Sequence, residues 1–145
     1  SNRYIVLGLD RYSAPQVYRP LSIDSEGRVY TEVKALKFVA ISATGVDNTV
    51  VAAVIGKKIR VHQLCLALSA SDTIRFESGA GGTALTGAIP ITAGPVTALL
   101  SGVNGVLVLP YSQSGWFETA AGQLLNLELA GGANAFGMLA YTEVD

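Results

Sequence analysis

The sequence predicts an all-β protein: an antiparallel β-sandwich, jelly-roll-like, with an extended N-terminal arm. Three observations predict this class. Valine, isoleucine, threonine, tyrosine and phenylalanine alternate with glycine and serine along most of the chain, which is typical of strands. Turn-forming residues interrupt the apolar segments at short intervals. The best helical candidate, residues 119–125, is broken by Gly122.

Residues 1–35 are predicted to form an extended N-terminal arm or hairpin. Ten charged residues and four of the 6 tyrosines fall within residues 1–37. Short strand-like pieces at Tyr4–Leu9, Val17–Ile23 and Arg28–Val33 are separated by turn signals. Such an arm could pair with a neighbouring subunit or fold back as edge strands. The alternative interpretation is a solvated, partly disordered tail.

Residues 36–145 are predicted to form a continuous β-sandwich domain. Many short strands joined by short turns are typical of sandwiches and jelly rolls. The expected strands are Leu36–Ala43, Thr49–Ile55, Lys58–Ser69, Asp72–Ser78, Ala84–Ile91, Val96–Leu100, Gly105–Leu109, Trp116–Thr119, Gln123–Leu129 and Phe136–Val144.

Two of these strands show strict alternation. In Asp72–Ser78 the apolar residues occupy every second position, and in Gln123–Leu129 the leucines alternate with Asn126 and Glu128. This period predicts antiparallel strands with one buried and one solvated face. Lys58–Ser69 changes phase midway, so we expect a bulge near His62. The expected core anchors are Trp116, Phe117, Phe76, Leu125 and Leu127.

The chain is unusually poor in charge. Charged residues make up 14% of the sequence, none lies between Ser78 and Phe117, and no Lys or Arg follows Arg75. About a quarter is usual for a soluble domain, and charge keeps proteins solvated and apart. We therefore expect much of the surface to be covered by other protein in a permanent assembly. The basic groups gather in the first half, which could contact an acidic neighbour or reflect chance in a sparse set.

Composition also limits the cofactors and partners. No Arg/Lys cluster interleaved with aromatics indicates nucleic-acid binding, and no unbroken apolar stretch is long enough to span a membrane. His62 is the only histidine and Cys65 the only cysteine, which cannot supply a metal cluster. Since Cys65 sits in an apolar run, we expect a buried, inert thiol. No cofactor is predicted.

The sequence gives little support for catalysis. A nucleophile would need a base, and only His62 is available. The carboxylates of the β domain are few and scattered, unlike a glycosidase pair. The Gly-rich segment 79–82 lacks a following lysine and helix, so we interpret it as a turn. The aromatics Tyr111, Trp116 and Phe117 could stack on a sugar, although a single Trp is more often a core residue.

Two segments resemble known proteins. Residues 19–29, RPLSIDSEGRV, resemble a hairpin near the N-terminus of many tailed-bacteriophage virion proteins. Residues 109–127, from LPYSQSGWFETAAG to LLNL, with the later Gly137 and Tyr141, resemble the C-terminal half of small β-rich phage structural proteins. Residues 57–61 and 76–79 also fit that pattern. The chain therefore resembles capsid decoration, or cement, proteins.

The resemblance implies a non-enzymatic virion protein on the capsid surface, assembled in the host cytoplasm. Such proteins are often homotrimers that also bind the major capsid protein. The uncharged strands of residues 84–109 are the candidate subunit–subunit face.

The alternative is a tail, fibre or receptor-binding module that recognises host glycans near Trp116. The candidate shell-contact residues are Arg3, Tyr4, Arg11, Tyr12, Tyr18 and Arg19, since Arg and Tyr are common binding hot spots.

Overall fold

The computed structural model describes residues 4–5, 21–22, 26, 35–92 and 105–145. The chain divides into two compact units, Ser1–Lys34 and Ala35–Asp145. In the first unit β1 (Tyr4–Ile5) pairs with β2 (Leu21–Ser22) in antiparallel fashion. Of the candidate shell-contact residues, Tyr4 lies in β1, whereas Arg3, Arg11, Tyr12, Tyr18 and Arg19 lie outside the described residues.

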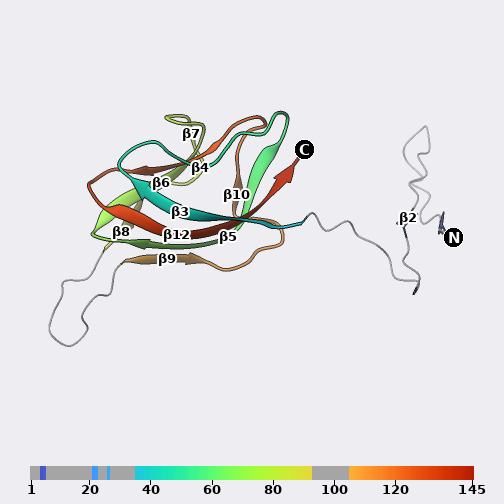
Figure 1. The fold of residues 1–145 in the computed structure, drawn as a ribbon, viewed down its shortest axis with the longest axis horizontal. Coiled ribbons are helices and arrows are strands. Elements are labelled where there is room, and N and C mark those ends of the chain that lie inside the picture. Colours follow the sequence, from blue (N-terminus) through green and yellow to red (C-terminus); the bar gives the residue numbers. More distant parts are fainter. Residues whose placement is uncertain (1–3, 6–20, 23–25, 27–34, 93–104) are drawn as a thin grey trace. The chain divides into compact units, whose positions relative to one another are not determined.

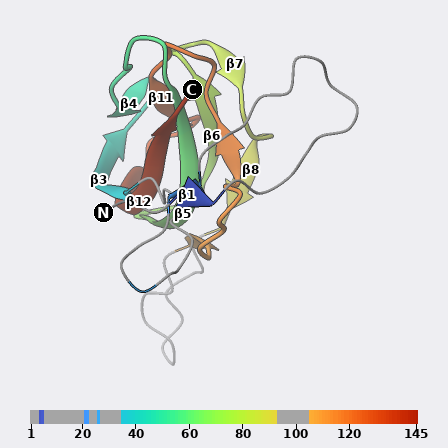
Figure 2. The same cartoon turned by 90° about the vertical axis from the view of Figure 1, so that its right-hand side faces the viewer.

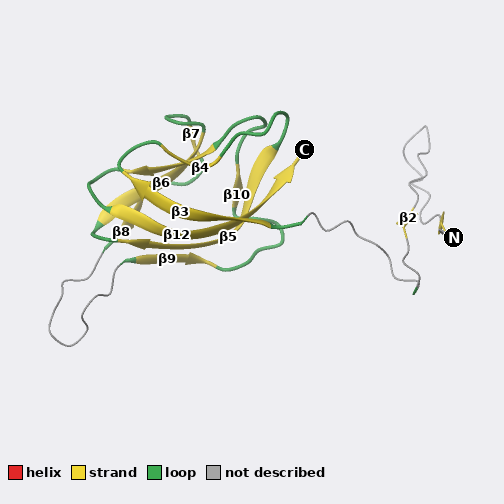
Figure 3. Cartoon of the chain, viewed as in Figure 1, coloured by secondary structure: helices red, strands yellow, loops and turns green. Residues whose placement is uncertain are grey.

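The second unit is a β-sandwich of two five-stranded antiparallel sheets (Figure 1). The first sheet contains β3 (Lys37–Thr44), β5 (Lys58–Leu68), β9 (Val106–Leu109), β10 (Phe117–Glu118) and β12 (Asn134–Val144). The second contains β4 (Asn48–Val51), β6 (Asp72–Ser78), β7 (Thr83–Ala84), β8 (Ile89–Ile91) and β11 (Leu125–Leu129). The described residues form strands and loops without a helix (Figure 3), so the all-β prediction is confirmed.

The chain passes repeatedly from one sheet to the other. The first sheet has the order β3-β12-β5, with β9 and β10 on the other edge of β5; β3, β12 and β5 lie side by side in Figure 2. The second has the order β4-β11-β6, with β7 and β8 on the other edge of β6. Successive strands of the domain therefore lie in different sheets, except at β6–β8 and β9–β10.

Two of the expected strands differ substantially from the observed ones, whereas the other described strands differ by at most two residues at either end. Thr49–Ile55 was expected as one strand, but β4 ends at Val51, ahead of a turn in which Gly56 has a φ of 70°. Residues 84–91 form two short strands on one edge of β6, because an irregular segment from Leu85 to Ala88 separates them. The strand expected at residues 96–100 lies outside the described residues.

The core lies between the two sheets. Phe76, Leu125 and Leu127 are fully buried, as the alternation predicted. Phe117 is half-buried, with its ring centroid 5.1 Å from that of Phe76. Trp116 is 47% exposed, so its expected role as a core anchor is wrong. Consecutive residues of a strand face opposite ways, and here Phe117 takes the inward position.

The bulge expected near His62 is present. Between β5 and β12 the register passes from Gln63 opposite Ala140 to Val61 opposite Tyr141, which leaves His62 as the extra residue. The apolar face of β5 is restored on both sides, because Ile59 and Val61 are buried before the bulge and the even-numbered leucines after it. The same alternation turns Cys65 outward; its thiol is exposed, so the expectation of a buried cysteine is wrong.

The solvated face expected for β6 and β11 is covered in its centre. Asn126 and Glu77 are buried, and the amide Nδ2 of Asn126 donates to Asp47 Oδ1 and to Glu77 Oε2, both at 3.2 Å. Asp47 belongs to the turn between β3 and β4 and adopts a φ of 58°. It also accepts a bond from the backbone N–H of Gly81. Two turns distant in sequence therefore close over this polar face.

Candidate functional site

The single histidine has a structural environment. His62 is buried, its Nδ1 lies 2.7 Å from the carbonyl oxygen of Ser112, and its Nε2 lies 2.8 Å from Thr142 Oγ1. A carbonyl only accepts, so Nδ1 carries a proton, and in the neutral ring Nε2 then accepts from the threonine hydroxyl. The Nδ1 bond therefore holds the β9–β10 loop to β5, and the Nε2 bond joins β5 to β12. Among the described residues no group of three or more His, Cys, Asp or Glu could hold a metal ion.

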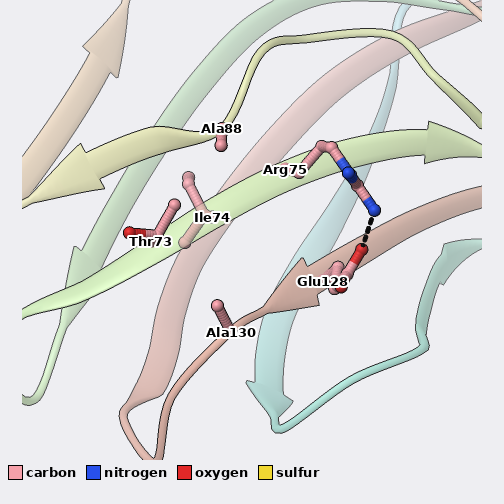
Figure 4. A pocket seen from close by; sticks show the side chains of 6 residues that line it. All are labelled: Thr73, Ile74, Arg75, Ala88, Glu128 and Ala130. Carbon is pink, nitrogen blue, oxygen red and sulfur yellow. Dashed lines mark hydrogen bonds and ion pairs between the residues drawn. The ribbon is translucent and has the colours of Figure 1, made fainter.

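Two carboxylates of the second sheet, those of Glu77 and Glu128, gather around Arg75. Its Nη2 is 2.6 Å from Glu77 Oε1. The same nitrogen is 2.6 Å from Glu128 Oε2 (Figure 4). Burial by itself would raise the pKa of Glu77, but the hydrogen bonds that it accepts from Asn126 and Arg75, together with the positive charge of Arg75, outweigh burial, and the net pKa lies below the ordinary value. A carboxylate held in its ionised form has no proton to donate at neutral pH. The arrangement cross-links two strands.

A small cavity adjoins this ion-pair cluster (Figure 4). It has a volume of about 80 Å³, which holds a few water molecules at most. Thr73, Ile74, Arg75, Ala88, Glu128 and Ala130 line it. Because its two charged side chains are bound to each other, it offers a substrate little beyond one threonine hydroxyl.

A larger apolar groove lies at the sandwich edge beside Trp116. Its volume is about 220 Å³. Trp116 Nε1 donates to the carbonyl oxygen of Pro110 at 2.8 Å, and Thr86 Oγ1 accepts from the backbone N–H of Phe76 at 3.1 Å. The indole N–H is thus already used, and the lining is mostly apolar, which favours apolar contact over the convergent hydrogen bonds that a sugar needs. The lining residues are Phe76, Leu85, Thr86, Ile89, Leu107, Leu109, Trp116 and Phe117.

The outer surface of the first sheet carries exposed apolar side chains from four adjacent strands. Phe38 is 64% exposed, Phe136 50%, Met138 46%, Val106 57% and Val108 59%. The pairing registers place them in three rows across the sheet, and we call these rows the outer apolar face: Ser42, Phe136, Ala67 and Val106; Ala40, Met138, Cys65 and Val108; Phe38, Ala140 and Gln63. Ser42 and Gln63 are its two polar members, and Ala140 is fully buried. Paired side chains lie about 5 Å apart, so the surface is continuous.

Ionic groups border this face at one end. Lys58 and Arg60 alternate with buried residues of β5 and therefore point outward before the His62 bulge. Glu118 in β10 lies opposite Arg60; its carboxylate is 2.8 Å from Arg60 Nη2 and 3.3 Å from Lys58 Nζ. The hydrogen bond from Arg60 holds the pKa of Glu118 below its usual value. An apolar centre with a charged border is the usual anatomy of a protein–protein interface.

The predicted subunit face and the observed apolar face overlap only in part. Of the described residues in 84–109, Val106 and Val108 lie on the outer apolar face, whereas Leu107 and Leu109 line the groove. Residues 93–104 of that prediction lie outside the described residues. Phe38, Phe136 and Met138 were not among the expected contact residues, because each of their strands has apolar residues in both phases of the alternation.

Comparisons with protein-family models, with curated proteins and with solved structures find no match to this chain. In the described residues no helix is both long and apolar enough to cross a membrane. What the chain does is therefore inferred from its own residues.

Proposed function

We propose that this chain is a non-enzymatic virion structural protein that decorates and stabilises a bacteriophage capsid. It acts by subunit–subunit contacts, as a homotrimer, and by contacts with the major capsid protein. The outer apolar face carries the proposal, because a β-sandwich with an uncharged surface across four strands is suited to contact with other protein. The resemblance of residues 109–127 to small phage structural proteins supports placing this contact in a bacteriophage virion.

The polar chemistry of the domain favours a structural role over a catalytic one. The nitrogens of His62 are both bonded within the fold, and Glu77 and Glu128 share one arginine. An active site generally keeps an acid, base or nucleophile available to a substrate in a cleft. In the described residues the larger groove is apolar and the ionic groups mostly neutralise one another, as expected where contact is the function.

Shell contact is assigned to the N-terminal arm. Arg3, Tyr4, Arg11, Tyr12, Tyr18 and Arg19 are the residue types that most often dominate binding energy. Arginine adds multidentate hydrogen bonding to carboxylates, and tyrosine adds a large apolar ring with a polar tip. In this proposal the N-terminal arm binds the capsid shell, and the β-sandwich domain binds neighbouring subunits.

The test is co-sedimentation with undecorated heads of the phage that encodes the chain. The full chain is expected to sediment with the heads. A form lacking residues 1–35, and a form with Arg3, Arg11 and Arg19 changed to Ala, are expected to remain in the supernatant while keeping the β circular-dichroism spectrum of the full chain. Absence of binding by the full chain would contradict the capsid role.

A glycan-binding tail module is the second candidate, favoured by the exposed ring of Trp116. Aromatic rings at a sandwich edge can stack on sugars. A glycan array distinguishes the two functions: saturable binding that is lost in Trp116→Ala, with folding unchanged, would support the receptor role. No binding is expected if the chain decorates a capsid.

A further inference from the structure

The outer apolar face has the dimensions of an interface centre. Its three rows occupy eleven positions on four strands. Strands lie ~4.8 Å apart and same-face residues ~6.8 Å apart along a strand, so the eight positions that are apolar and at least partly exposed cover about 260 Å² in plan. A standard interface buries ~800 Å² per partner, with an apolar centre inside a polar border. The face therefore supplies about a third of such an area as an apolar centre, and the surrounding residues can form the border.

The charges of this face suit a copy of itself. None of the eleven positions carries an ionisable acid or base other than the thiol of Cys65. Two copies can therefore meet without like charges facing each other, which would cost affinity. At the border both signs are present, with Lys58 and Arg60 beside Glu118, so cations of one copy can approach the anion of the next. A strongly acidic partner or an anionic membrane would find no cation in the centre.

We infer that a second copy of this chain packs on the outer apolar face. The inference rests on the proposed function, since it names the surface through which the subunits of a contact protein meet. Phe38, Phe136 and Met138 are the anchors, and Val106 and Val108 form the margin on β9. Packing removes these side chains from water, which is the principal driving force for association.

The test compares two double variants by sedimentation velocity at micromolar concentration. Val108→Ser with Phe136→Ser removes two apolar groups from the face. Val46→Ser with Ile55→Ser is the matched control, because these residues are 63% and 97% exposed and lie in turns of the same domain outside the face. The unmodified full chain and the control are expected to be oligomers. The face variant is expected to dissociate, with a dissociation constant raised about a hundredfold or more, while its circular dichroism is unchanged.

Each other outcome overturns the inference. If the face variant remains as oligomeric as the control, subunits meet elsewhere, although co-sedimentation with heads could still support the capsid role. If the unmodified chain is a monomer, no second copy covers the face. In that case, loss of head binding in the face variant would assign the face to the coat protein. The mass of the oligomer distinguishes a two-fold pair of faces from the homotrimer implied by the resemblance.

Discussion

Replacing His62 with alanine tests how the bulge in β5 is held. The ring contributes a hydrogen bond to the Ser112 carbonyl, a hydrogen bond from the Thr142 hydroxyl, and stacking on Tyr111 at a centroid distance of 5.9 Å and an interplanar angle of 21°. His62→Ala removes all three interactions at a buried position. The β9–β10 loop then loses its side-chain attachment to the sheet.

The expected loss follows from these contacts. Each hydrogen bond contributes roughly 0.5–1.5 kcal/mol, and an aromatic stack adds about 0.5–1.5 kcal/mol. The three together predict a decrease of about 3 kcal/mol in the free energy of unfolding. Urea denaturation followed by circular dichroism measures this decrease as a lower midpoint with an unchanged slope.

Gln63→Ala is the matched control, because Gln63 is the next residue on the same strand and is exposed. Its effect is expected to stay within about 0.5 kcal/mol. Tyr111→Leu removes the stack alone and should cost about 1 kcal/mol. If His62→Ala were as stable as Gln63→Ala, the hydrogen bonds of the ring would not hold the bulge, and the reasoning would be refuted.

Three further changes test the packing and the ion pairs. Leu127→Ala is expected to cost about 2–5 kcal/mol in urea denaturation, and Trp116→Ala less, because Trp116 is 47% exposed; the reverse order would restore the original core prediction. Gly137→Ala should cost about 1–3 kcal/mol, since a Cβ there would collide with the carbonyl oxygen of Cys65; equal stability would show that the strands can shift. The lowered pKa of Glu118 means that its contribution is present above its ordinary value of 4.5 and is lost as the pH falls through the lower folded value. The melting-temperature difference between wild type and Glu118→Gln should therefore be largest at neutral pH and disappear in acid, and a constant difference would contradict the ion pair.

Local alternation predicted the strands and the bulge well. The side-chain period of a strand is two, so the phase change between Val61 and Leu64 required an extra residue, and the structure places it at His62. The buried leucines of β11 follow from the same rule. These features depend on residues close in sequence, which is why the sequence alone was sufficient.

The sequence could not show which face of β3 and β12 is exposed to solvent. In β3 and β12 both phases contain apolar residues, and only the position of the second sheet decides that Ile41 and Leu139 are buried while Phe38 and Met138 are exposed. That position depends on contacts between residues distant in sequence. The outer apolar face was therefore visible only after the strands were paired.

The burial of Asn126 and the exposure of Trp116 also depend on residues distant in sequence. Asn126 alternates with leucines along β11, as a solvated residue would. It is nevertheless buried, and its side chain donates a hydrogen bond to Asp47 in the turn between β3 and β4. Trp116 was expected in the core because of its size, but its indole N–H bonds to the carbonyl of Pro110 at the surface. Neither partner could be identified from spacing.

Burial of the outer apolar face in the assembled protein is tested most directly by the reactivity of Cys65. This thiol is exposed in the single chain and lies in the middle row of the face, between Met138 and Val108. The rate of its modification by a small thiol reagent is expected to fall as the protein concentration rises through the range in which the oligomer forms. A rate that is the same at all concentrations, with the chain known to be oligomeric, would contradict the packing of copies on this face.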